Sequence, residues 1–176
     1  GPPFNAAQAI APDGQRLANY RKTHLFGDLD RAQFSAGDTA SQVFNWRGWR
    51  LGLLICYDVE FPEAVRGLAL QGADAVLVPT ANMVPFDEVQ RVLLPARALE
   101  NSLYLAYANA CGQEGGLHYN GLSQVNAPDG SATAQAGAGE TQLRATLQAS
   151  ARTATPAAQL QDRRSDLCGP LAQSQR

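Results

Sequence analysis

Cys56 lies where a buried strand is expected to end. Residues 49–55 form an apolar run that predicts a core strand, and polar residues follow the cysteine at once. Pro62 then stands where a first helical turn would begin. A thiol at the end of a core strand is typical of a nucleophile, because the strand fixes the sulfur and the following turn exposes N–H groups that can hold an oxyanion. The alternative is that Cys56 is a small hydrophobe buried for packing.

Lys22 is the second residue that can do chemistry. It lies at the expected end of another strand, and a polar loop over residues 27–39 that includes Asp30 separates it from the cysteine strand. A nearby ammonium favours the thiolate form of a cysteine and can hand a proton to a leaving amine. Taken alone, Lys22 is better explained as a solvated lysine in a turn. The pairing with Cys56 is what favours a covalent mechanism.

Two hairpins and a parallel sheet must position these residues. Residues 4–10 and 17–20 flank a Pro-Asp-Gly turn, and Arg47-Gly48 separates the two arms of a second hairpin. A strand–helix–strand–helix–strand series then implies parallel strands with right-handed crossovers. We expect strands over 43–46, 49–55, 74–79 and 103–109, and helices over 61–71 and 87–101, with a kink or reset of the first turn at Pro95.

The C-terminal third is expected to add further strands and a tail. Residues 111–119 read as a glycine-rich loop, and strands over 121–126 and 141–147 flank a second Pro-Asp-Gly turn. A last helix over about 149–161 would precede a tail that extends over the surface or a partner. We expect a single domain over residues 1–176.

Composition narrows the class of protein. The chain has 176 residues, of which 45% are hydrophobic and 17% charged, as in soluble globular proteins. A net charge of −2 gives no indication of nucleic-acid binding or of attraction to a membrane surface. The 3 cysteines are widely spaced and suggest neither a disulfide framework nor a metal site, which favours a reducing, cytoplasmic location.

Several motifs in a fixed order resemble the nitrilase superfamily of carbon–nitrogen hydrolases. YRKTHL, FSAGD and GLLICYDVEFPE carry the resemblance, followed by PTAN, PARALEN and YAN. The segments GLS and PDG resemble the closing strands of that family. The similarity runs from Phe4 to about Leu147 and is greatest to amidase-type members that act on aliphatic amides.

The resemblance implies an α/β fold, the α-β-β-α sandwich of carbon–nitrogen hydrolases, and hydrolysis of a non-peptide C–N bond by a Glu–Lys–Cys triad. Cys56 matches the nucleophile and Lys22 the lysine that steadies the oxyanion, which the backbone N–H of Tyr57 would share. Asp30 stands where the family often has a second glutamate, and Asn82 is a candidate pocket residue. The resemblance implies no metal or organic cofactor, a small-molecule amide as partner, and a homo-oligomer.

One departure from the family pattern concerns the general base. In the family this glutamate precedes the lysine hairpin, and no glutamate of this chain matches it. We therefore expect the chain to be N-terminally truncated, as a fragment or a shortened gene product. Within the same chemistry, a nitrilase or an N-carbamoyl amino acid hydrolase is the alternative. In another class, the alternative is a non-catalytic fragment or pseudoenzyme that packs on a partner.

Overall fold

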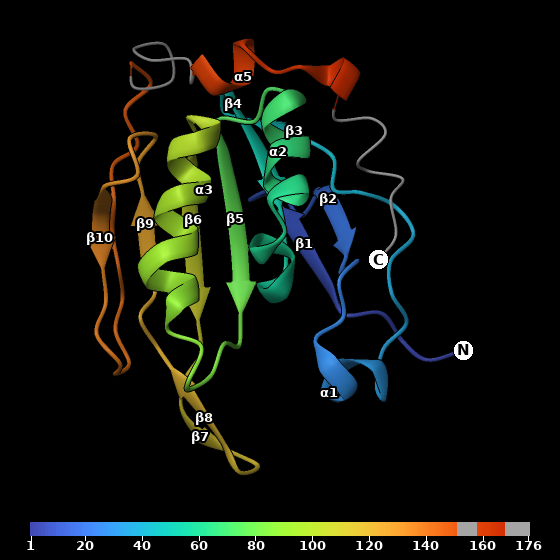
Figure 1. Cartoon of the computed structure of the whole chain (residues 1–176). Helices are drawn as coiled ribbons and strands as arrows, with labels where there is room; N and C mark the ends of the chain where they lie inside the picture. Colours follow the sequence, from blue (N-terminus) through green and yellow to red (C-terminus); the bar gives the residue numbers. More distant parts are fainter. Residues whose placement is uncertain (151–157, 168–176) are drawn as a thin grey trace.

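A mixed six-stranded sheet forms the centre of the protein (Figure 1). The computed structural model describes residues 1–150 and 158–167. The three central strands, β4, β5 and β6, run parallel, and the outer strands are antiparallel to their neighbours. Across the sheet the order is β10 (Ala132–Gln135), β9 (Gln124–Asn126), β6 (Tyr104–Asn109), β5 (Ala75–Thr80), β4 (Trp49–Leu53) and β3 (Phe44–Trp46). The predicted strand–helix–strand series with parallel pairing is confirmed.

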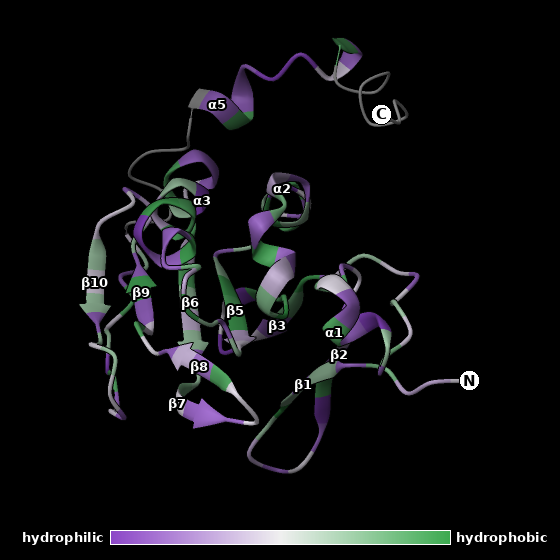
Figure 2. Cartoon of the chain, turned by 60° about the horizontal axis from the view of Figure 1, so that its bottom comes forward, coloured by the Kyte–Doolittle hydropathy of each residue, from purple (hydrophilic) through white to green (hydrophobic). Residues whose placement is uncertain are grey.

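Two helices cover one face of this sheet (Figures 1 and 2). Helix α2 (Pro62–Leu70) begins at its proline and buries Val65 and Leu68. Helix α3 (Leu94–Asn101) buries Leu94 and Ala98, and Pro95 lies in its first turn after the π-helical segment η2 (Val89–Leu93). The predicted reset at Pro95 is therefore confirmed, because a proline lacks the N–H that a continuous helix requires.

The first hairpin forms a separate two-stranded sheet on the other side of the main sheet (Figure 2). Its strands are β1 (Ala6–Ile10) and β2 (Arg16–Arg21), joined by the expected turn. Tyr20 of β2 is 5% exposed and belongs to the same hydrophobic cluster as Leu53 and Val76 of the main sheet. The hairpin thus packs on the central core and delivers its C-terminal end to the edge where β4 and β5 also end.

Short elements complete the described chain. Helix α1 (Gly27–Arg31) lies in the predicted polar loop, and the 3-10 turn η1 (Cys56–Glu60) follows β4. A second small hairpin is made by β7 (Cys111–Glu114) and β8 (Leu117–Asn120), and helix α5 (Ala158–Gln161) lies near the C-terminal end. Among residues 1–150 and 158–167, no helix combines the length and hydrophobicity needed to cross a membrane.

Three predicted elements differ from the structure. Residues 111–119 form the β7–β8 hairpin and not an open loop. Residues 141–147 carry no strand; the partner of β9 is β10, because the tight turn closed by Ala127 and Ser131 returns the chain directly onto β9. Of the helix expected over 149–161, residues 158–161 are helical, and residues 151–157 lie outside the described part, as do residues 168–176 of the tail.

Candidate active site

Cys56 occupies a sharp turn directly after the core strand. Strand β4 stops at Leu53, two residues before the predicted end, because the N–H of Ile55 donates to the Asp58 side chain at 3.1 Å and leaves the sheet ladder. Cys56 itself has φ = 48°, in the left-handed region that non-glycine residues seldom occupy. Strained backbone of this kind is concentrated at functional sites, where it presents a side chain that a regular strand or helix would not expose.

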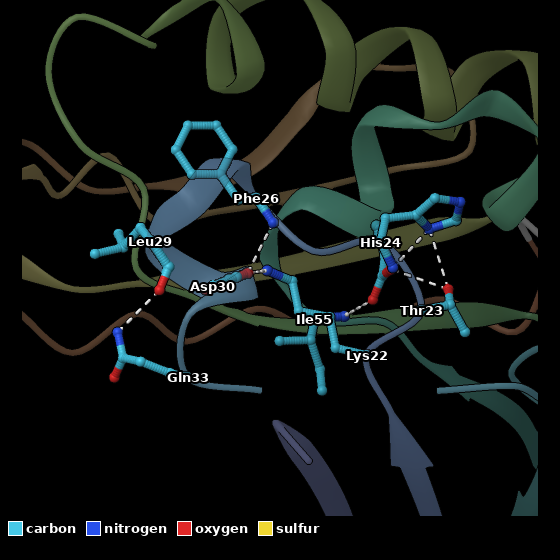
Figure 3. Close-up of polar contacts among 9 residues, drawn as sticks. Lys22, Thr23, His24, Phe26, Leu29, Asp30, Gln33 and Ile55 are labelled. Carbon is cyan, nitrogen blue, oxygen red and sulfur yellow. Dashed lines mark hydrogen bonds and ion pairs between the residues drawn. The ribbon is translucent and has the colours of Figure 1, made fainter. Parts of the chain in front are cut away.

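Lys22 follows β2 and is 2% exposed. Its backbone is fixed on both sides, since its N–H donates to Asn5 and its carbonyl accepts from Gly37. Its ammonium contacts the Asp30 carboxylate, which also accepts the N–H of Phe26 at 2.9 Å (Figure 3). A buried lysine needs a partner of opposite charge, and helix α1 supplies it. The structure thus brings Lys22 together with Asp30, the residue at which the resemblance places a second carboxylate.

A fully buried carboxylate links the lysine segment to the cysteine turn. Asp58 is 0% exposed. One of its oxygens accepts the backbone N–H of His24 at 2.9 Å and the Thr23 hydroxyl at 3.2 Å, and it lies 2.8 Å from the His24 ring nitrogen Nδ1. The other oxygen accepts the N–H of Ile55, so Asp58 fixes the end of β2 relative to the residue before Cys56.

A cavity of about 660 Å³ opens at this edge of the sheet, and the candidate residues meet there. Lys22, Asp30, Cys56 and Asn82 line it, together with Glu60 from the end of η1. Tyr57 is placed differently: its ring packs edge-on against Phe26 and Phe61, while its backbone N–H faces the Cys56 sulfur. The structure thus assembles four of the five predicted side chains around one cavity and contributes Tyr57 through its backbone.

The charge state of Cys56 follows from its surroundings. Burial raises the pKa of the Cys56 thiol above its ordinary value. The N–H of Ala81, the Lys22 ammonium and the N–H of Tyr57 oppose this effect, and the Asp30 carboxylate adds to it. Because burial dominates, the resting form is the thiol, and the cavity offers donors that stabilise negative charge once it develops near the sulfur.

Asn82 belongs to a network of side-chain amides in and behind the cavity wall. Its side-chain nitrogen donates to the Phe86 carbonyl at 2.9 Å and to Gln90 at 3.1 Å, and Gln90 donates to Asn120 at 3.0 Å. Asn109 donates to the same Asn120 oxygen at 2.7 Å. Through these bonds the Asn82 side chain caps the turn that follows β5 and forms part of a rigid cavity wall.

Sequence reasoning did not find Glu60, Gln90, Asn109 or Asn120 as parts of this region. The hydrogen-bond partners of Gln90, Asn109 and Asn120 lie 8 or more positions away along the chain, so spacing carries no signal for these three residues. Glu60 does not match the general base of the family, and its position four residues after Cys56 is the only indication of its place that the sequence offers.

The described residues contain no group of three or more histidine, cysteine, aspartate or glutamate side chains placed to hold a metal ion. Cys56 and Cys111 are both free thiols. The groups that the described lining residues bring to this cavity are a thiol, an ammonium, carboxylates and backbone donors.

Comparison with known proteins identifies the family. Residues 1–157 match the family model described as carbon-nitrogen hydrolase. The chain belongs to the carbon-nitrogen hydrolase family. The predicted resemblance to amidase-type members of the nitrilase superfamily and the predicted fold class are confirmed by this match and by solved amidases.

Relatives of this carbon-nitrogen hydrolase chain include bacterial hydrolases and amidases. A protein named "hydrolase in pqqF 5'region" from Pseudomonas protegens is 56% identical over 144 residues, covering 82% of this chain and 50% of the relative. An (R)-stereoselective amidase from a Pseudomonas species is 43% identical over 138 residues, covering 78% and 49%. The chain thus spans about half the length of the curated relatives that it matches.

Solved structures of an amidase from Nesterenkonia share the fold. One superposes with a TM-score of 0.87 at 43% identity, covering 94% of this chain and 60% of that chain. Another, of a variant of that amidase, is described as showing Michael addition of acrylamide at the active site cysteine. The described fold of the carbon-nitrogen hydrolase chain therefore corresponds to about three fifths of a complete amidase.

Proposed function

We propose that this chain carries the nucleophile and the oxyanion site of a carbon-nitrogen hydrolase that acts on small aliphatic amides. The observation that supports this most strongly is the placement of Cys56, on a left-handed turn, in one cavity with the buried Lys22 ammonium. The family membership and the amidase relatives agree with this chemistry.

In the proposed reaction the Cys56 sulfur attacks the amide carbon. The C=O electron pair moves to oxygen, and Lys22 and the N–H of Tyr57 stabilise the resulting negative charge. As the oxyanion collapses, the C–N bond breaks, the nitrogen takes up the proton that the thiol lost, and ammonia leaves. The acyl group remains on Cys56 as a thioester, which water then hydrolyses to a carboxylic acid and the free thiol.

Because the pKa of Cys56 is raised, the proposed reaction requires a base. A thiol that is protonated at rest must lose its proton as it attacks, so a base has to act in the first step. Asp30 is engaged by Lys22 and Phe26, and we assign the role of general base to none of the described carboxylates. Acylation of Cys56 is therefore the step to test first on this chain.

Mass spectrometry of the chain after incubation with propionamide or acrylamide tests the proposal. We expect an acyl or alkyl adduct on the peptide that contains Cys56, and its loss in Cys56→Ala. Cys111 in the same sample is the matched control thiol, since it is also free but does not line the cavity. Equal modification of both cysteines, or none at Cys56, contradicts the proposal and favours the non-catalytic alternative.

The same cysteine chemistry is compatible with substrates other than simple amides. A nitrilase or an N-carbamoyl amino acid hydrolase stays the alternative, and ammonia release from butyronitrile or an N-carbamoyl amino acid, compared with butyramide, separates the three. The single domain over residues 1–176, the cytoplasmic location and the homo-oligomer stay predictions.

A further inference from the structure

Glu60 is the one residue of the cysteine turn whose charged group faces the cavity without a partner of its own. It lies four residues after Cys56, at the end of η1, and lines the cavity with Cys56 and Lys22. Among the described residues, no hydrogen bond or ion pair involves its carboxylate. Its backbone is fixed, since Arg97 donates to the carbonyl oxygens of Val59 at 3.2 Å and Glu60 at 2.8 Å. A clamped backbone with an unpaired side-chain charge leaves that charge available to a ligand.

Negatively charged side chains outnumber positively charged ones among the described residues that line the cavity. Among its described lining residues the cation is Lys22, and the carboxylates are Asp30, Glu60 and Glu114; arginine and histidine do not line it. Asp30 already contacts Lys22. Glu60 and Glu114 therefore have no ion-pair partner among the described residues that line the cavity. Burial raises the pKa of Glu60, while Lys22 and Arg97 oppose this, so negative charge at Glu60 is held at a cost that a nearby cation would relieve.

The remaining wall decides what the acyl group meets. Phe26, Leu29 and Ile55 present apolar surface, as do Met83 and Leu117, which suits an aliphatic chain. A carboxylate on that chain would enter a partly desolvated space beside Glu60. The ammonium that could receive it is Lys22, which is paired with Asp30 and is needed for the oxyanion. A neutral chain meets no such repulsion, and a positive end group gains an attraction.

We propose that Glu60 sets the substrate class of this site: it admits amides with a neutral or positively charged acyl group and rejects those that carry a carboxylate. This inference rests on the proposed function, because it concerns the acyl group that reaches Cys56. Glu114, on the β7–β8 hairpin, contributes charge of the same sign at the cavity.

Three thiol reagents of one chemistry test the charge of the site without requiring turnover. Methyl, 2-aminoethyl and 2-sulfonatoethyl methanethiosulfonate are neutral, cationic and anionic. Their rates at Cys56 are measured by peptide mass spectrometry and divided by their rates with N-acetylcysteine amide, which removes intrinsic reactivity. After this correction, we expect the cationic reagent to react with Cys56 about tenfold faster than the anionic one. A factor of this size corresponds to roughly one charge–charge interaction in a partly screened site.

Matched variants assign the effect to Glu60. Glu60→Gln should bring the cationic and anionic rates within about twofold to threefold of each other, and Glu60→Asp should retain the preference. Glu63→Gln removes the same charge from an exposed position that does not line the cavity and should leave the ratio unchanged. Circular dichroism of each variant checks folding. If Glu60→Gln does not fold, Glu60→Asp and Glu114→Gln still measure the contribution of lining carboxylates.

Equal corrected rates for the anionic and cationic reagents in the unmodified chain overturn the inference. So does an equal response to Glu60→Gln and Glu63→Gln. Neither result bears on whether Cys56 forms a thioester with propionamide, so the proposed function and this inference fail separately. Assays of ammonia release test the same preference with substrates. We expect kcat/KM to be higher for 4-aminobutyramide and for butyramide than for succinamate, which carries a carboxylate.

Discussion

Asp58 and Glu60 are two carboxylates on the same short turn, and their environments are opposite. Asp58 is fully buried and accepts hydrogen bonds through both oxygens, from Thr23 and His24 on one side and Ile55 on the other. Glu60 faces the cavity with no partner among the described residues. Although only one residue separates them, the Asp58 carboxylate lies in the core and the Glu60 side chain lines the cavity.

The difference shows how this turn separates structure from chemistry. A buried carboxylate is stable only when donors satisfy it, and Asp58 uses those donors to hold the lysine segment against the cysteine turn. The position of Lys22 relative to Cys56 therefore depends on Asp58, whose hydrogen bonds go to neighbouring residues of the two segments. Glu60 has the reverse role, because its unsatisfied charge contributes little to folding and is available for selection of a ligand.

The largest effect expected from this comparison is that of Asp58→Ala. Removing the carboxylate leaves the buried N–H of Ile55 and the part-buried N–H of His24 without acceptors, which should lower the free energy of unfolding by roughly 3–5 kcal/mol. Asp58→Asn keeps one acceptor oxygen and should lose less. Urea denaturation measures both. Asp28→Ala is the control, since its side chain is fully exposed, and should change stability by under about 0.5 kcal/mol.

A second effect concerns the arginine that holds the end of the turn. Arg97→Met preserves most of the packing volume but removes the donors to the Val59 and Glu60 carbonyls. We expect a loss of roughly 2–3 kcal/mol in urea denaturation, from carbonyl groups left without partners. Arg91→Met removes an exposed arginine from the preceding helical segment and serves as the control. If the two variants are equally stable, Arg97 does not clamp the turn.

Much of the framework could be predicted because it depends on local signals. The Pro-Asp-Gly and Arg47-Gly48 turns, the apolar run before Cys56 and Pro62 at the start of α2 are all readable within a few residues. Lys22 and Cys56 could be placed at one edge because both follow strands of the same core. The prediction of a strand over 141–147 was wrong. The residues there resemble a strand locally, but the tight turn after β9 brings residues 132–135 onto β9 instead.

The partners of buried polar groups could not be predicted in the same way. His24 and Asp58 are 34 positions apart, and so are Gln90 and Gln124, whose side-chain nitrogen donates to the Gln90 carbonyl at 2.6 Å. Such pairs are decided by tertiary packing and leave no period in the sequence. The direction of Glu60 was equally hidden, because neighbouring residues of a 3-10 turn point to different sides and the sequence does not say which side is the cavity.

The titration of Cys56 gives a third prediction, of intermediate size. Since burial raises its pKa, the rate of alkylation by iodoacetamide should rise with pH through a midpoint above that of N-acetylcysteine amide. Lys22→Met removes a cation that lowers this pKa and should move the midpoint further up. Arg21→Met, next to it but exposed, should not. A Cys56 midpoint below that of the free thiol would contradict the dominance of burial over the surrounding donors.

The same raised pKa links Cys56 to folding. The folded state binds the thiol proton more tightly than the unfolded chain does. The associated stability is therefore fully present below the ordinary thiol pKa and is lost as pH rises through the raised value. Cys56→Ala removes this dependence, so the difference in unfolding free energy between the two proteins should shrink or reverse at alkaline pH.

The smallest expected effect is on stability at Glu60, and it is the sharpest test of the contrast with Asp58. Burial raises the Glu60 pKa, so its folded form holds the proton more tightly and its ionised form opposes folding. Below the ordinary glutamate range both states are protonated, and Glu60→Gln should match the unmodified protein. As pH rises through that range and the raised pKa, the variant should become the more stable of the two, by less than about 1 kcal/mol.

Urea midpoints of Glu60→Gln and Asp58→Asn, measured on both sides of the glutamate range, complete this comparison. The two variants remove one negative charge each from the same turn, so their formal charge is identical. We expect opposite signs above that range, a small gain for Glu60→Gln and a clear loss for Asp58→Asn, because donors surround one carboxylate and not the other. A loss of similar size in both variants would mean that Glu60 also holds the fold together, and its charge would then not be free to select a ligand.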